Sequence, residues 1–412
     1  MSSSSSSSFE DDETLTLIPG LPNDISLLIL AFIPYSHYSR IKPTCKSWRS
    51  LLSSKTLISL RQSHLNSSQL LCIFPNDPSL SPPYLFDPQN LAWCPLPPMP
   101  CNPHAYGLSN FVSIAVESHL YVLGGSLFDT RSFPMNRPSP SSKLARLDVF
   151  RAEWEELAPM ISPRGSFACA VVPGGEGRGE IVVAGGGSRH PMFGAAGSRM
   201  SLVEKYDIEK DEWVALDVLP RFRAGCVGYL VGKGAEMEFW VMGGYGSSRT
   251  VSGVFPVDEY YRDGVVLELK NGGKWRGVGD MWEEGERRRL GNVVVVNGND
   301  GDLRGIFMLD GSDIFRYDIS CNRWLKESNV PRKAHDDSSF GFVALNEELH
   351  VLSSLKSVNS SEIRRPQIHK RGKTLLIQIY DPKRRTWRSL RTKPPFHCPL
   401  DFKTAVMSTI RL

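Results

Sequence analysis

The residues able to carry out chemistry are scattered along this sequence. Its nine histidines form no local pair with metal-ligand spacing, and its eight cysteines include no C-x-x-C pair. Gly232-Lys233 lacks the upstream glycine and the following Ser or Thr of a phosphate-binding loop, and the glycine-rich run 174–179 is better explained as a hairpin turn between two strands. We therefore expect no catalytic residue, no metal and no cofactor.

Composition narrows the class of protein. The chain has 412 residues, of which 41% are hydrophobic, 10% aromatic and 22% charged, enough apolar surface for a folded core. The net charge of +4 argues against a dedicated nucleic-acid binder, and no apolar run approaches the roughly 18 residues of a membrane helix. Residues 1–16 are typical of a disordered Ser-rich leader and unlike a signal peptide. We expect an intracellular protein, in the cytoplasm, the nucleus or both, with reduced thiols and without nucleic-acid or membrane partners.

A tryptophan recurs along most of the chain at intervals of 49 to 63 residues. Six residues before it stands an aspartate in five of the six copies, and an apolar or aromatic residue precedes each aspartate. This order predicts a strand end, a polar turn and a strand that carries the tryptophan, which together form a hairpin. The tryptophans are Trp93, Trp154, Trp213, Trp275, Trp324 and Trp387, and the matching earlier positions are Asp87, Asp148, Asp207, Leu269, Asp318 and Asp381.

Further apolar runs precede most of these hairpins, so each unit is expected to hold four strands. The second run ends in glycines in the clearest copies, at 120–125, 181–187 and 239–244. Four-stranded units of about 50 residues with a double glycine, an aromatic-Asp pair and a tryptophan resemble kelch repeats, the blades of a β-propeller. The first copy lacks its first strand, and the chain ends with a spare one at 404–412. We therefore predict a mainly β fold, a six-bladed kelch propeller over 70–412 that the C-terminal strand closes.

Residues 17–60 form a different kind of segment. The run 17–24, LIPGLPND, leads into apolar positions at helical spacing, with Asn23 or Asp24 as the expected helix N-cap. A second apolar set follows Pro34, which predicts two or three short amphipathic helices that bury little core of their own. The pattern resembles a small α-helical F-box, apart from Pro43, which lies where that family has helix. The residues that match the motif's apolar positions are Leu21, Pro22, Ile25, Leu28, Ile29, Ile33, Pro34, Ile41, Cys45, Trp48 and Leu51.

The two resemblances together imply a function. F-box proteins are the substrate receptors of Skp-cullin-F-box ubiquitin ligases, so segment 17–60 is expected to dock on a Skp-type adaptor and, through it, on a cullin. The similarity to plant F-box/kelch-repeat proteins implies that the propeller, joined by a linker at 61–69, binds a target protein for ubiquitination and proteasomal degradation. The chain itself would then not be an enzyme. The alternatives are a non-degradative kelch scaffold or adaptor and a propeller enzyme.

Long loops are expected at one end of the propeller, which we call the loop face. In a four-stranded antiparallel blade, the loop between the second and third strands lies at the same end as the connection to the next blade, and basic residues outnumber acidic ones in these segments. We predict that their arginines bind an acidic or phosphorylated segment of the target. The alternative is that the arginines of the connections cap neighbouring loop carbonyls. The candidates are Arg131, Arg164, Arg189, Arg223, Arg249 and Arg332.

Overall fold

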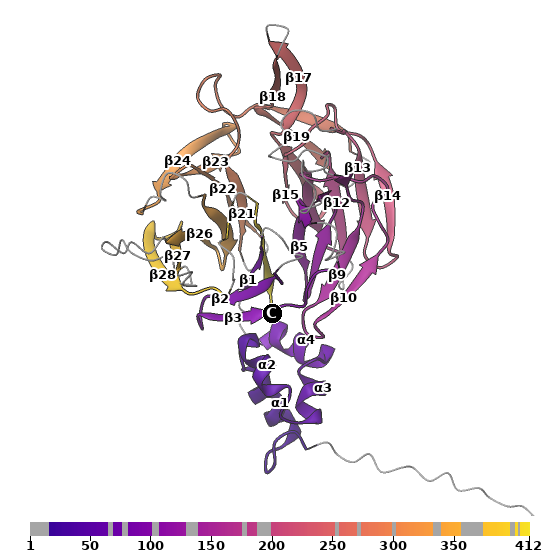
Figure 1. Cartoon of the computed structure of the whole chain (residues 1–412), viewed down its shortest axis with the longest axis vertical. Helices are drawn as coiled ribbons and strands as arrows, with labels where there is room; N and C mark the ends of the chain where they lie inside the picture. Colours follow the sequence, from indigo (N-terminus) through magenta and orange to yellow (C-terminus); the bar gives the residue numbers. More distant parts are fainter. Residues whose placement is uncertain are drawn as a thin grey trace, which may run out of the picture. The chain divides into compact units, whose positions relative to one another are not determined.

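The computed structural model divides the chain into a helical unit, residues 1–67 with Leu412, and a β unit, residues 68–411 (Figure 1). The described residues are 16–64, 69–75, 81–100, 107–128, 139–174, 179–187, 199–251, 255–269, 273–298, 302–332, 339–355, 374–395, 400–402 and 404–412. Over these ranges, no helix is both long enough and apolar enough to cross a membrane.

The helical unit has short helices separated by tight turns. Its elements are α1 (Asn23–Ala31), the 3-10 turn η1 (Tyr35–His37), α2 (Tyr38–Ile41), α3 (Lys46–Leu51) and α4 (Lys55–His64). The expected N-cap is wrong, because Pro22 occupies that position in α1, and the Asn23 Oδ1 instead accepts a hydrogen bond from the Leu17 N–H at 3.1 Å. Pro43 lies in the turn between α2 and α3, where it interrupts no helix. Helix α4 extends into the segment expected to be a linker.

The described residues of the β unit contain six four-stranded antiparallel sheets, numbered here from the first to the sixth. The first is β29 (Val406–Arg411), β1 (Gln69–Phe74), β2 (Tyr84–Asp87) and β3 (Ala92–Pro95); the second is β5 (Val112–Val116), β6 (His119–Leu123), β9 (Leu144–Asp148) and β10 (Glu153–Leu157). The third is β11 (Ala168–Val172), β12 (Glu180–Ala184), β13 (Val203–Asp207) and β14 (Glu212–Leu216); the fourth is β15 (Val227–Val231), β16 (Glu238–Met242), β19 (Asp263–Glu268) and β20 (Trp275–Asp280). The fifth is β21 (Asn292–Asn297), β22 (Leu303–Asp310), β23 (Asp313–Asp318) and β24 (Arg323–Asn329); the sixth is β25 (Gly341–Leu345), β26 (Glu348–Leu355), β27 (Thr374–Asp381) and β28 (Thr386–Thr392). Smaller additions are the three-stranded sheet β4 (Gly107–Ser109), β7 (Ser126–Phe128) and β8 (Ser139–Pro140), the hairpin β17 (Tyr245–Val251) and β18 (Phe255–Tyr260), and the 3-10 turn η3 (Gly234–Glu236).

The recurring aspartate stabilises the turn between the third and fourth strands of a sheet. Its Oδ1 accepts backbone N–H groups from nearby turn residues, as Asp207 does from Glu209 at 3.0 Å and Lys210 at 3.1 Å. Two positions before the tryptophan, a left-handed residue with φ between 48° and 58° completes five of these turns. These residues are Leu91, Ala152, Asp211, Asn322 and Arg385.

The fourth sheet departs from this pattern because its turn is longer. Trp275 lies opposite Leu267 in the ladder, whereas Trp213 of the third sheet lies opposite Tyr206. One additional residue therefore separates the two partners in the fourth sheet. This insertion explains why Leu269, and not an aspartate, stands six residues before Trp275.

The tryptophan side chains link each sheet to the one before it. Trp154, Trp213, Trp275 and Trp387 donate their indole N–H to Pro97 O, Ala158 O, Asp217 O and Ser328 Oγ of the preceding unit. Trp93 of the first sheet donates to Thr392 Oγ1 of the sixth at 2.8 Å. The exception is Trp324, whose buried indole N–H has no hydrogen-bond partner among the described residues.

Apolar clusters fill the spaces between successive sheets from the second to the sixth, and another joins the sixth to the first. Between the first and second sheets, the rings of Phe74 and Phe111 lie 5.4 Å apart and Ser408 Oγ is 2.9 Å from Ser113 Oγ. Strand β29 pairs with β1 from Arg411 opposite Gln69 to Val406 opposite Phe74. The predicted mainly β fold with a small helical N-terminal unit is confirmed.

Candidate interaction surfaces

Large apolar side chains of the helical unit face solvent along α1 and the turn before it. They are Leu21, Ile25, Leu28, Ile29 and Phe32, with exposed fractions from 39% at Leu21 to 67% at Phe32. Their spacing of three or four residues puts most of them on one side of the helix. We call this set the α1 apolar face.

The other side of α1 packs inside the helical unit against α4. Leu30 and Ala31 are buried there, and Arg61 from α4 reaches the end of α1. The Arg61 Nη1 donates to the carbonyl oxygens of Ala31 at 2.8 Å and Ile33 at 2.5 Å, and its guanidinium lies 5.6 Å from the centre of the Tyr38 ring. These carbonyl groups lack partners within the helix, so the arginine fixes the end of α1 and with it the orientation of the apolar face.

The predicted adaptor-binding residues fall into two groups. Leu21, Pro22, Ile25, Leu28, Ile29 and Cys45 are exposed, whereas Ile33, Pro34, Ile41, Trp48 and Leu51 are half-buried. Trp48 has an internal contact, because its indole N–H donates to Leu17 O at 2.7 Å. Phe32 is missing from the sequence-based set, although its place seven residues after Ile25 is the signal that identifies it as part of the same face.

Two of the arginines predicted to face a target are fully buried. Arg164 forms an ion pair with Glu204 and donates through Nη1 to Leu202 O at 2.8 Å. Arg223 pairs with Asp263 at 2.8 Å and donates through Nη1 to the carbonyl of the Gly243 residue. The prediction that Arg164 and Arg223 contact a target is therefore corrected, because both are enclosed among loop carbonyls and a carboxylate.

The backbone of the same two arginines joins neighbouring sheets. The Arg164 carbonyl accepts from the Gly125 N–H at 2.8 Å, and the Arg223 carbonyl accepts from the Gly186 N–H at 2.7 Å. This approach requires glycine at the ends of the second strands, since a Cβ on Gly185 would lie 2.5 Å from the Arg223 oxygen. The double glycine and the arginine thus form the same contact twice, between the second and third sheets and between the third and fourth.

Contact of the other four predicted arginines with a target is neither supported nor contradicted by their positions. Arg332 is exposed, and its backbone N–H and C=O pair with the Gln378 side chain at 2.9 and 3.0 Å. Arg131 and Arg189 lie outside the described residues, as does the side chain of Arg249 in β17. Their contact with a target stays a prediction.

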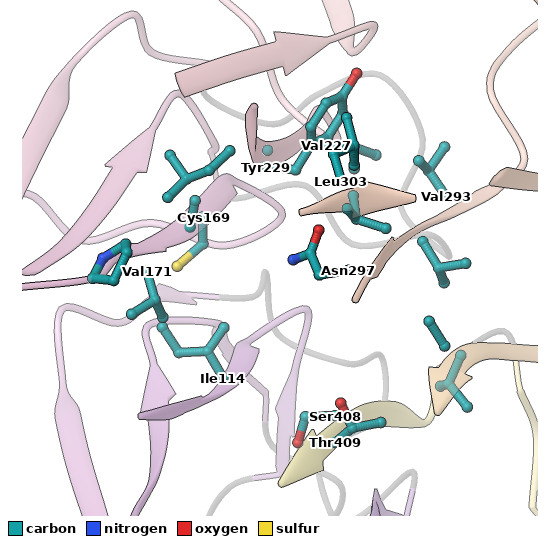
Figure 2. Close-up of a pocket in the computed structure, with 18 of the residues that line it drawn as sticks. Ile114, Cys169, Val171, Val227, Tyr229, Val293, Asn297, Leu303, Ser408 and Thr409 are labelled. Atoms are coloured by element: carbon teal, nitrogen blue, oxygen red, sulfur yellow. The ribbon is translucent and has the colours of Figure 1, made fainter. Parts of the chain in front are cut away.

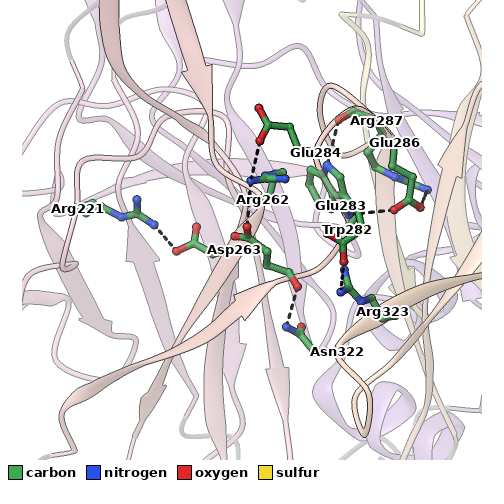
Figure 3. A network of polar contacts seen from close by, with 11 residues as sticks. Arg221, Arg262, Asp263, Trp282, Glu283, Glu284, Glu286, Arg287, Asn322 and Arg323 are labelled. Carbon is green, nitrogen blue, oxygen red and sulfur yellow. Dashed lines mark hydrogen bonds and ion pairs between the residues drawn. The ribbon is translucent and has the colours of Figure 1, made fainter.

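Ion pairs link connections and strand ends of the third, fourth and fifth sheets (Figure 3). Arg221 also pairs with Asp263, and its guanidinium lies 4.1 Å from the centre of the Tyr261 ring. Arg262 pairs with Asp280 at 3.2 Å, and Arg323 pairs with Glu283. Asp263 thus receives two guanidinium groups, from Arg221 and Arg223.

A cavity of about 880 Å³ lies among β5, β11, β15, β21, β25 and β29, the first strand of each sheet (Figure 2). Among the described strands, each of these six pairs on one side only, so the wall combines backbone edges with side chains such as Ile114, Val171 and Val293. Burial raises the pKa of the Cys169 thiol, which keeps it protonated at neutral pH. Within the described ranges, no three His, Cys, Asp or Glu side chains gather as a metal site. The described lining offers a binding space and contains no histidine to serve as a base.

Comparison with known proteins identifies the family of the chain. Residues 18–60 match the F-box domain family. The chain belongs to the F-box/kelch-repeat proteins, as its relatives show. F-box/kelch-repeat protein OR23 of Arabidopsis thaliana is 59% identical to it over 415 aligned residues, covering 97% of this chain and 93% of the relative. F-box/kelch-repeat protein At1g16250 of the same plant is 25% identical, with 82% of each chain covered.

Proposed function

We propose that this protein is the substrate-recognition subunit of a Skp-cullin-F-box ubiquitin ligase. The observation that carries the proposal is the α1 apolar face, exposed on a unit that matches the F-box family. A contiguous apolar face on a soluble domain marks an interaction site, because burying it against a partner is favourable. The partner is a Skp-type adaptor, which contacts the α1 apolar face and, through its own binding to a cullin, recruits the ligase.

The β unit is, in this proposal, a six-bladed kelch propeller closed by β29. Support comes from the first sheet, which combines β29 with strands from the beginning of the unit. The Trp93 bond to Thr392 connects the first sheet to the sixth, and the Ser408 contact with Ser113 connects β29 to the second. Closure places every sheet between two neighbours, which gives a rigid platform for loops that bind a target.

The chain itself performs no chemistry in this mechanism. The F-box holds the adaptor, the propeller holds a target protein, and the assembly brings lysines of the target close to a ubiquitin-loaded enzyme. Tethering of this kind raises the effective concentration of the reacting groups without a new catalytic residue. The target is then ubiquitinated and degraded inside the cell, in the cytoplasm or the nucleus.

A matched pair of substitutions tests the adaptor site. Ile29 on α1 and Ile319 in a turn of the β unit are similarly exposed, at 43% and 41%. We expect Ile29→Asp in the full chain to weaken binding of a purified Skp-type adaptor at least about tenfold, since a charge would enter an apolar contact. Ile319→Asp should leave the affinity unchanged in the same calorimetric titration.

Adaptor docking through α1 would be refuted if Ile29→Asp and the unsubstituted chain bound the adaptor with equal affinity while circular dichroism showed the helical content unchanged.

Degradation is tested separately in cells that lack the chain. A bound partner whose half-life is lengthened there supports a ligase receptor. A bound partner whose half-life does not change identifies a scaffold instead.

A further inference from the structure

Four exposed apolar side chains lie at the loop face around the third sheet. They are Ile161, Leu202, Val218 and Phe222, with exposed fractions of 42% to 58%. Ile161 belongs to the connection from β10 to β11, Leu202 directly precedes β13, and the other two belong to the connection from β14 to β15. We call them the third-sheet patch.

Backbone contacts show that these segments are neighbours. Arg164, three residues after Ile161, donates to the carbonyl of Leu202 itself at 2.8 Å. On the other side, the Leu219 N–H donates to Ser201 O at 2.8 Å and the Arg223 N–H to Met200 O at 3.2 Å. The segment that carries Leu202 therefore lies between the two connections, and the four exposed side chains extend from neighbouring segments of backbone.

A buried carboxylate fixes the backbone segment that carries Ile161. The Glu204 carboxylate accepts the N–H of Ile161 at 2.9 Å and that of Ser162 at 3.1 Å, besides its ion pair with Arg164. Glu204 and Arg164 are both buried, so these bonds are shielded from water. A patch on backbone fixed in this way is pre-organised, and a ligand meets little cost of ordering the loops.

The grouping distinguishes these residues from ordinary exposed apolar side chains. Leu91, Val214, Ile319 and Leu325, the other large apolar side chains that are exposed in the described part of the β unit, lie in hairpin turns or on fourth strands. Scattered residues of that kind need no explanation, whereas exposed apolar side chains grouped on neighbouring, hydrogen-bonded segments indicate an interaction site.

Charge beside the patch indicates what binds there. Arg221 directly precedes Phe222, its side chain is half-exposed, and it shares the single carboxylate of Asp263 with Arg223. The trio therefore carries one excess positive charge at the Phe222 side of the patch, whereas the exposed Asp217 directly precedes Val218. A carboxylate of a ligand complements that charge, while a lysine or arginine there is repelled.

We propose that the third-sheet patch binds a short segment of the target protein in which a bulky apolar side chain stands beside Asp or Glu. This inference rests on the proposed function, since it names the feature that the propeller recognises. The apolar side chain packs among Ile161, Leu202 and Phe222, and the carboxylate pairs with Arg221. Apolar contact supplies most of the affinity, and Arg221 supplies the preference for acidic neighbours.

Three series of immobilised synthetic peptides with the same randomised flanks test the proposal. One series carries Phe or Leu beside Glu, the second replaces Glu by Lys, and the third replaces the apolar residue by Ser. The full chain should bind the first series at least about tenfold more tightly than the other two. Phe222→Ser should reduce binding of the first series to the level of the third.

Two variants separate the contributions within the patch. Arg221→Gln should abolish the discrimination between Glu and Lys while the apolar requirement remains, because Asp263 still has Arg223. Val214→Ser serves as the matched control, since Val214 is 51% exposed on β14 of the same sheet and outside the patch. Its peptide binding should equal that of the unsubstituted chain.

Several results would overturn the proposal. One is an absence of binding to all three series, and another is an equal loss of peptide binding from Phe222→Ser and Val214→Ser. A third is a dimer in light scattering that Phe222→Ser converts to a monomer, which would identify the patch as a contact between copies of this chain. Adaptor affinity is measured on the same preparations. Peptide selection without adaptor binding refutes the ligase proposal alone, and adaptor binding without peptide selection refutes the patch alone.

Discussion

Truncating one side chain of the C-terminal strand tests whether the propeller is closed. Ile410 in β29 is 1% exposed and lies opposite Leu70 of β1. Ile410→Ala removes buried carbon atoms and leaves a cavity, which costs about 2–5 kcal/mol at a buried aliphatic site. Ile319→Ala is the matched control, because the same change at a side chain 41% exposed should cost no more than about 0.5 kcal/mol.

Urea unfolding followed by tryptophan fluorescence measures the difference. With an m value of about 3 kcal/mol per molar urea, a loss of about 3 kcal/mol lowers the midpoint by about 1 M. Amide exchange then shows how far the loss extends. In a closed ring the sheets unfold together, so the most protected amides of β15 in the fourth sheet should lose protection along with those of β1.

An open arrangement gives a different result. If β29 were only an added edge strand, Ile410→Ala would expose β1 while the amides of β15 kept their protection. That outcome, or equal unfolding midpoints for Ile410→Ala and Ile319→Ala, would refute closure by β29.

Three further predictions concern the contacts inside the β unit. Glu204→Gln should lower the free energy of unfolding in urea by about 3 kcal/mol, because it leaves the buried Arg164 guanidinium without an opposite charge. Glu155→Gln removes an exposed ion pair and should cost less than about 1 kcal/mol. Trp93→Phe should lower the thermal midpoint more than Trp324→Phe, since only the first removes a hydrogen bond, and equal shifts would contradict the role of the Trp93 bond between sheets. Burial lowers the pKa of His350 in the folded protein to about 4, below its ordinary value, so the histidine of the unfolded chain binds a proton first as the pH falls. The free energy of unfolding should therefore fall by up to about 3 kcal/mol from pH 6.5 to 4. His350→Gln should reduce this dependence on pH.

The hairpin repeat is readable from the sequence because its determinants are local. An aspartate such as Asp207 bonds N–H groups two and three residues away, and Trp213 pairs with Tyr206 within the same hairpin. Each unit therefore repeats the same spacing. The fourth unit fails the pattern for an equally local reason, an additional residue in the turn before Trp275.

The arginines could not be placed in the same way, because their partners are distant in sequence. Arg164 is buried only because Glu204, forty residues later, reaches its guanidinium, and Arg223 depends in the same manner on Asp263. Both carboxylates stand forty residues after their arginines, but this shared spacing becomes informative only once the contacts are known, because no local pattern marks either acidic residue. An arginine in a connection thus looks the same in sequence whether it binds a ligand or caps a neighbouring loop.

At this loop face, the residues that stabilise the connections differ from the residues proposed to bind a target. Glu204, Arg164 and the glycine pairs fix the backbone of the connections through buried contacts, whereas Ile161 and Phe222 project from that backbone into solvent. Replacing a buried member of this framework disturbs a charged or close-packed contact and costs stability. Replacing an exposed patch residue costs little stability, because few contacts in the free protein are lost. In the proposed propeller, changes at a few exposed positions of the connections would therefore alter the target that is bound while the buried contacts between the sheets stay the same.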